Sequence, residues 1–227
     1  MVSPFAARLT AEQRAAWQAL SSPASIQAFL DSIPYSAEDA NRSPLRVLRE
    51  RQAHCLDGGL FAAAALRQLG YPPLIVDMLP DPGADDDHVL AIFRRNGCFG
   101  AVAKSNFAGL RFREPIYRSL RDLVMSYFEV YYNLRGEKTL RTYTVPLDLS
   151  AYDAINWLTD DAAADTIEKR LPQLRRTALL TSAMIAELSP VDRRSYEAGM
   201  LGVNAAGLYQ PTTGSPASNS GKQEVQK

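Results

Sequence analysis

Residues 53–70, AHCLDGGLFAAAALRQLG, place a cysteine at the beginning of a long apolar helix. Small and apolar side chains run almost unbroken from Leu60 to Leu66, which predicts a helix that is buried on most sides. Gly70 and the prolines at 72 and 73 predict where this helix ends. Cys55 therefore lies at or within the first helical turn, where unpaired backbone N–H groups and the positive end of the helix dipole favour the thiolate over the thiol.

The second chemical signal is a histidine at the start of a predicted hairpin. Residues 88–93, HVLAIF, and 98–103, CFGAVA, have the composition of strands, and the Asn96-Gly97 pair between them is typical of a two-residue turn. A cysteine at a helix start and a histidine at a strand start are suited to form a thiolate–imidazolium pair. In such a pair His88 accepts the thiol proton and later returns it to the leaving group.

The other histidine and the other cysteine suit these roles less well. His54 immediately precedes Cys55, and its side chain is expected to point away from the thiol. We therefore expect His54 to pack, to bond to backbone or to contact substrate. Cys98 follows the hairpin turn at the end of the sheet away from His88, which indicates a structural or surface thiol.

The cysteine helix and the residues after it resemble a known family. Cys55, Asp57, the alanine-rich helix and LGYPPLIV (69–76) are similar to the nucleophile helix and following strand of the transglutaminase-like branch of the papain-like cysteine enzymes. His88-Val89 and the hairpin are similar to that family's histidine strand, so the resemblance spans roughly residues 30–106. It implies an α+β core with a Cys–His–acid or Cys–His–amide triad. It does not imply one reaction, because members include protein crosslinkers, proteases, amidases and acetyltransferases.

The third member of the triad departs from the family's commonest pattern. There, an Asp lies on the strand after the histidine, and here that position falls on Ala103, which cannot orient an imidazole. A two-residue hairpin turn places Ser105 opposite His88, whereas the two possible three-residue turns place Lys104 or Asn106 there. Asn106 is chemically the better candidate, because its carboxamide oxygen can accept the imidazole N–H. Ser105 is geometrically the simpler one, and the choice depends on the register.

Composition excludes several classes of function. Basic and acidic residues balance at 25 each, which argues against a dedicated surface for nucleic acid or for an anionic membrane. No apolar run is long enough to span a bilayer. Two distant cysteines and the lack of a cationic and apolar leader in residues 1–20 indicate a cytoplasmic protein with unbridged thiols. The acidic run Asp85–Asp87 lacks the glycine and terminal glutamate of a calcium loop, so we expect no metal and no cofactor.

The predicted fold class is α+β, with the nucleophile helix packed on an antiparallel sheet of at least three strands. Residues 1–150 are expected to form a papain/transglutaminase-like core that includes the N-terminal helices. Residues 151–210 are expected to form a helical extension packed on that core. Residues 211–227 are rich in Ser, Thr, Gly and Gln, which predicts a disordered tail.

These observations favour a cysteine-dependent acyl-transfer enzyme that acts on a peptide, amide or thioester carbonyl. Cys55 would attack the carbonyl, its backbone N–H and a second donor would hold the oxyanion, and His88 would carry the proton, oriented by Asn106 or Ser105. Water as acceptor gives an amidase or peptidase, and an amine gives an acyltransferase. An aromatic upstream of the cysteine can donate to the oxyanion in the resembled family, but Tyr35 is expected to be a tyrosine at the edge of the core.

The alternative is a non-catalytic binding or scaffold module that has kept the fold. Ala103, at the family's usual Asp position, favours it. The sequence does not identify a protein partner.

Overall fold

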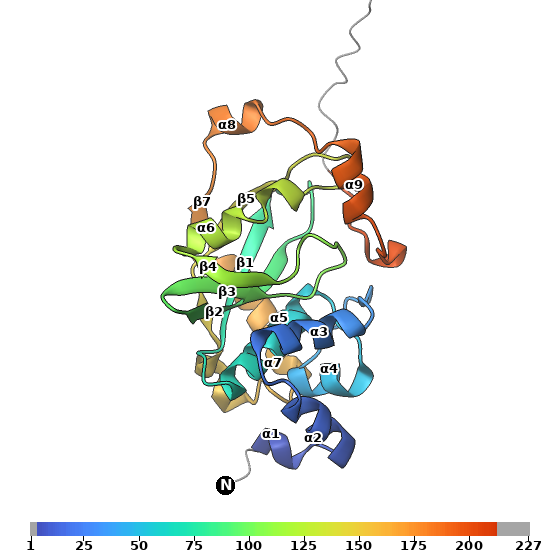
Figure 1. Ribbon diagram of the computed structural model, residues 1–227, viewed down its shortest axis with the longest axis vertical. Helices are drawn as coiled ribbons and strands as arrows, with labels where there is room; N and C mark the ends of the chain where they lie inside the picture. The colour runs from blue at the N-terminus through green and yellow to red at the C-terminus, as the bar shows by residue number, and fades with distance from the viewer. Residues whose placement is uncertain (1–3, 213–227) are drawn as a thin grey trace, which may run out of the picture.

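The computed structural model describes residues 4–212 and has an α+β architecture built on a seven-stranded antiparallel sheet (Figure 1). The predicted α+β class is therefore confirmed. The strand order is β4-β3-β2-β1-β5-β7, and β6 pairs with β1. The strands are β1 Leu74–Pro80, β2 His88–Arg95, β3 Cys98–Val102, β4 Arg113–Tyr117, β5 Leu140–Thr144, β6 Leu147–Asp148 and β7 Arg176–Ala178. The helices are α1 Pro4–Ala7, α2 Ala11–Gln18, α3 Pro23–Ser32, α4 Pro44–Glu50, α5 Cys55–Gln68, α6 Leu120–Met125, α7 Asp161–Arg170, α8 Ser182–Ala186 and α9 Arg193–Gly199.

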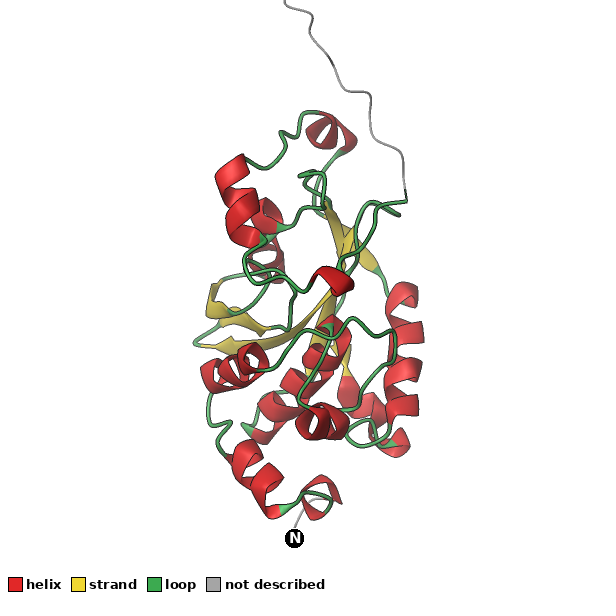
Figure 2. Cartoon of the chain, turned by 90° about the vertical axis from the view of Figure 1, so that its right-hand side faces the viewer, coloured by secondary structure: helices red, strands yellow, loops and turns green. Residues whose placement is uncertain are grey.

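The two faces of the sheet bury two separate apolar clusters. Side chains alternate between the faces of a strand, so Val89 and Ala91 of β2 pack toward α5 whereas Leu90 and Ile92 pack on the opposite side. Helices α2 to α5 and α7 lie on the first side and α6 on the second. Figure 2 shows the same strands with helices above and below them. This alternation decides which residues can reach Cys55.

Two glycines near the start of helix α5 let it pack closely against the sheet. A Cβ on Gly59 would lie 2.7 Å from Val89 Cγ1, and a Cβ on Gly58 would lie 2.1 Å from Lys104 Cβ. Neither position tolerates a side chain, so these glycines permit the close approach of helix and sheet. Cys55 is the first residue of the helix, as the sequence predicts.

The predicted hairpin is confirmed with its two-residue turn. Arg95 pairs with Cys98, and Asn96 and Gly97 have φ of 52° and 78°, which are the left-handed values that such a turn requires. The β2–β3 ladder ends at Ala91 and Val102, three residues before the register would reach His88 and Ser105. The hairpin therefore does not hold Ser105 opposite the histidine.

The C-terminal part contributes to the sheet as well as to the helices. Residues 151–210 are expected to form a helical extension, yet they also supply β7, which pairs with β5. Trp157 and Ile167 belong to the same apolar cluster as α5. Of the expected tail at 211–227, residues 213–227 lie outside the described residues. Within residues 4–212, no helix has both the length and the apolar character needed to cross a bilayer.

Candidate active site around Cys55

Cys55 lines an open cavity of about 540 Å³ at the N-terminal end of α5. The residue is 8% exposed, and its thiol donates to the Asp87 carbonyl over 4.0 Å. The cavity is bounded by the loop before α4, by the ends of β1 and β2, by α7 and by the C-terminal segment 206–209. A buried thiol that borders a cavity of this size can meet a ligand without unfolding.

Tyr35 is a polar neighbour of the cysteine in the cavity wall. A parallel bridge joins Tyr35 to Ala53, and Ser36 N–H donates to Ala53 O over 3.0 Å, so the phenol is held beside the start of α5. Burial raises the pKa of the phenol, and the phenol is close enough to Cys55 for the backbone and the thiol of that residue to affect this pKa. Tyr35 is half-buried, as a tyrosine at the edge of the core would be, and it also lines the cavity.

The thiol of Cys55 is not activated in this structure. Burial raises its pKa well above the ordinary value, and the nearby Asp87 and Asp86 carboxylates raise it further. These effects outweigh the start of the helix, which would favour the thiolate. The expected thiolate is thus replaced by a neutral thiol.

His88 does not pair with the cysteine. It shares a strand face with Leu90, on the side of the sheet away from α5, and its Nε2–H donates to the Leu110 carbonyl over 2.8 Å. The imidazole is 4% exposed, and burial lowers its pKa to about 4. Within residues 4–212 no hydrogen bond joins His88 to Cys55. The structure brings the two residues to neighbouring positions on opposite faces of β2.

The candidates for the third triad residue have other partners. The Asn106 side chain accepts from Asn204 N–H over 2.8 Å and donates to the carbonyls of Asn204 and Gly207 over 2.9 and 3.1 Å. The Ser105 hydroxyl accepts from Phe107 N–H over 3.0 Å. In the described part of the chain neither side chain bonds to the His88 imidazole. Asn106 instead fastens the C-terminal segment next to the cavity.

The imidazole that does line the cavity is His54. Its Nε2 lies 3.3 Å from Asp57 Oδ1, and Asp57 Oδ2 accepts from His54 N–H over 3.3 Å. Burial lowers the pKa of His54, and the Arg42 charge lowers it further, so the ring is neutral near pH 7. In the sequence, the signal for a place beside the thiol is the position of His54 directly before Cys55. The side chains of adjacent residues are, however, expected to point apart.

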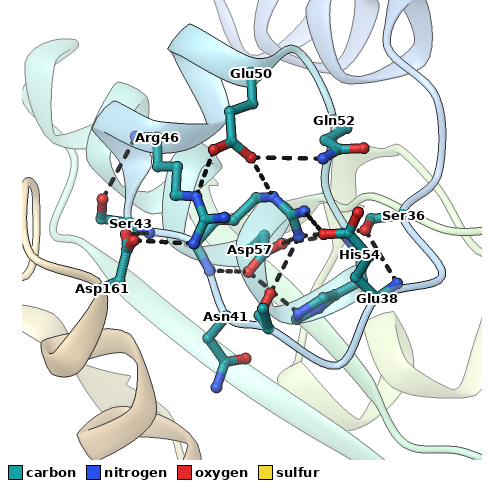
Figure 3. A network of polar contacts seen from close by, with 12 residues as sticks. Ser36, Glu38, Asn41, Ser43, Arg46, Glu50, Gln52, His54, Asp57 and Asp161 are labelled. Carbon is teal, nitrogen blue, oxygen red and sulfur yellow. Dashed lines mark hydrogen bonds and ion pairs between the residues drawn. The ribbon is translucent and has the colours of Figure 1, made fainter.

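A buried polar network anchors Asp57 (Figure 3). The Arg42 guanidinium is fully buried, and it contacts Asp57 Oδ2 at 3.4 Å, Glu50 Oε2 at 3.0 Å and Ser36 Oγ at 3.2 Å. Arg42 N–H also donates to Asp57 Oδ1 over 2.7 Å. The network joins the loop before α4 to the first turn of α5, and therefore positions both His54 and the cysteine.

Acidic side chains dominate the cavity wall. Six carboxylates line it, whereas no Lys or Arg does so among the described residues. The acidic residues are Glu38, Asp39, Asp77, Asp86, Asp87 and Glu168. No group of three or more His, Cys, Asp or Glu within residues 4–212 has an arrangement that could hold a metal ion.

Comparison of the chain with family models and with curated proteins finds no match. The function is therefore argued from the site.

Proposed function

We propose that this chain is a cysteine-dependent acyl-transfer enzyme with a papain/transglutaminase-like core, in which Cys55 is the nucleophile. The observation that carries the proposal is the grouping of the Cys55 thiol, its backbone N–H and the Tyr35 phenol on one wall of an open cavity. An acyl-transfer site needs a nucleophile next to two donors, and this wall offers all three groups.

The oxyanion is held by the Cys55 N–H and the Tyr35 O–H. Attack of the sulfur on an amide, peptide or thioester carbonyl forms the S–C bond and places negative charge on the carbonyl oxygen. The raised pKa of Tyr35 keeps its phenol protonated, so it remains a donor at neutral pH. Collapse of the intermediate breaks the C–N or C–S bond and leaves an acyl-thioester on Cys55.

The proton moves through His54. The neutral imidazole lines the cavity, and Asp57 lies behind its Nε2, which leaves Nδ1 to accept the thiol proton and return it to the leaving group. His88 has its Nε2–H on Leu110 and faces the other side of the sheet. Water then releases the acyl group in a hydrolase, and an amine accepts it in an acyltransferase.

A binding module that kept the fold is the second candidate. The raised pKa of Cys55 and the absence, within residues 4–212, of a hydrogen bond between its thiol and an imidazole favour it. In that case the cavity holds a ligand without a covalent step.

Acylation by activated donors separates the two candidates. The protein is mixed with p-nitrophenyl esters and acyl thioesters, and the acyl group is located by mass spectrometry with Cys98 as the internal reference. We expect an adduct on Cys55 that forms faster than on Cys98, which is more exposed. Tyr35→Phe should slow its formation about 100-fold. Equal or slower labelling of Cys55 would reject the enzyme and leave the binding module.

The same assay assigns the base. His54→Ala should slow acylation strongly at neutral pH while His88→Ala leaves it nearly unchanged in the folded fraction. The opposite result would give the role of base to His88. Circular dichroism of each variant shows which fraction is folded.

A further inference from the structure

Asp77 lines the Cys55 cavity and is a buried acidic residue with one carboxyl oxygen that has no partner in the described part of the chain. The residue is 1% exposed, and its backbone N–H donates to Thr144 Oγ1 over 3.0 Å. Its Oδ1, however, has no hydrogen-bond partner among residues 4–212. Buried polar atoms are nearly always hydrogen-bonded, because the loss of water is otherwise uncompensated. Because Asp77 lines the cavity, a donor that binds there would lie next to this carboxyl group.

The neighbouring acidic residues disfavour one another's ionisation. Burial raises the pKa of Asp77 to about 8, and the charge of Asp87 contributes. Desolvation within the cleft and the charge of Asp86 raise the pKa of Asp87 to about 7. The chain as a whole has equal numbers of acidic and basic residues, so the excess of acid is a local property of this cavity. Carboxylates that disfavour one another's ionisation are stabilised by a cation between them.

The guanidinium of Arg176 is near these acidic residues but does not pair with Asp77 Oδ1. Arg176, on β7, lowers the pKa of both Asp77 and Asp87, so its charge reaches them. Its guanidinium donates to the Pro172 carbonyl over 3.3 Å, and Asp77 Oδ1 remains without a partner in the described residues. The side chains also lack the close grouping that a metal ion requires.

We propose that this cavity binds its ligand through a hydrogen-bond-donating organic cation, an ammonium or guanidinium group, placed against Asp77, Asp86 and Asp87 beside Cys55. The group brings several N–H donors to the carboxyl groups that line the cavity. Its charge also opposes the effect of Asp86 and Asp87 on the thiol, so a bound cation lowers the pKa of Cys55. The relevance of this effect on Cys55 rests on the proposed function. The proposed binding of a cation does not.

Calorimetric titration of Cys55→Ala with a matched pair of probes tests the proposal. N-acetylarginine amide and N-acetylcitrulline amide have nearly the same shape, but only the first is charged. We expect the arginine probe to bind at least tenfold more tightly, and to bind more tightly as the pH rises from 6 to 9, because Asp77 and Asp87 must ionise to pair with it. N-acetyllysine amide shows which cation fits better.

Variants locate the bound cation. Asp77→Asn should abolish the preference for arginine over citrulline, and Asp86→Asn, at an exposed position, should weaken it without affecting the core. Glu114→Gln, on the exposed edge strand β4, removes the same charge elsewhere and should leave binding unchanged. Equal binding of the two probes, no binding of either at millimolar concentration, or an unchanged preference in both Asp variants would overturn the proposal.

The outcome is separable from that of the acylation assay. Uncharged acyl donors test Cys55 as nucleophile, whereas the titration uses a protein without that thiol. Cation binding without acylation would retain this inference and reject the enzyme. Acylation without cation preference would do the reverse.

Discussion

Asp57 and Asp77 are both fully buried aspartates near Cys55, and their surroundings are opposite. Asp57 receives hydrogen bonds from the backbone N–H groups of Arg42 and His54 and an ion pair from the Arg42 guanidinium (Figure 3). Asp77 Oδ1 has no partner within residues 4–212. Burial disfavours both charges, and for Asp57 the hydrogen bonds and the ion pair offset part of that cost. Asp57 therefore belongs to the internal network that positions the site, whereas Asp77 is the residue that we propose contacts a ligand.

The pKa values follow the same division. Burial raises the pKa of Asp57 to about 7, and the hydrogen bonds from Arg42 and His54 together with the charge of Arg42 oppose that rise. The pKa of Asp77 reaches about 8, where burial and the charge of Asp87 act together. A ligand cation would do for Asp77 what Arg42 does for Asp57.

The largest expected effect concerns Asp57, the aspartate that has an ion pair. Arg42→Met should lower the free energy of unfolding by about 3–5 kcal/mol, because it leaves Asp57 buried without its ion pair. Urea denaturation measures the loss. Arg46→Met is the matched control, since its side chain is 34% exposed in ion pairs with Glu50 and Asp161 and should cost less than about 1 kcal/mol. Similar losses in both variants would show that the buried pair is not special.

The second effect concerns Asp77, and it depends on pH. The folded pKa of Asp77 lies above its ordinary value of 3.8, so the folded state binds the extra proton and stability falls as the pH rises from about 4 to about 8. Asp77→Asn cannot ionise. Its stability relative to the wild type should therefore grow by up to about 1.4 kcal/mol per pH unit in this range. Parallel stability curves for the two proteins between pH 5 and 8 would contradict an elevated pKa.

The smallest effect concerns the thiol. Asp87 is the largest cause of the raised Cys55 pKa after burial, so Asp87→Asn should lower that pKa. Iodoacetamide should then alkylate Cys55 up to about tenfold faster at pH 8, with the rate at Cys98 unchanged. Glu114→Gln controls for the loss of one charge. No change at Cys55 would place the Asp87 carboxylate out of range of the thiol.

Local patterns account for what could be predicted. The Asn96-Gly97 turn determined the β2–β3 register because two left-handed residues allow one geometry. The helix start at Cys55 followed from the small and apolar run after it. Helix α6 ends at Met125, and a single 3-10 turn follows over Phe128–Val130.

The residues around the thiol depended on contacts distant in sequence. His88 faces away from Cys55 because strand side chains alternate and Val89 takes the place against Gly59. Asn106 is held by Asn204 and Gly207, about a hundred residues later. No local pattern reports either fact.

The sequence by itself determined the cysteine at the start of a buried helix, the hairpin after it and the α+β class, because these follow from periodicity, turn chemistry and glycine placement over a few residues. Only the tertiary structure decided that Tyr35 and His54 line the same cavity as Cys55, that this cavity concentrates acidic residues on a chain of balanced charge, and that Asp77 Oδ1 has no partner among residues 4–212. The reason is physical. Burial and electrostatic environment are sums over all surrounding atoms, and those atoms come from segments that meet only when the sheet has formed.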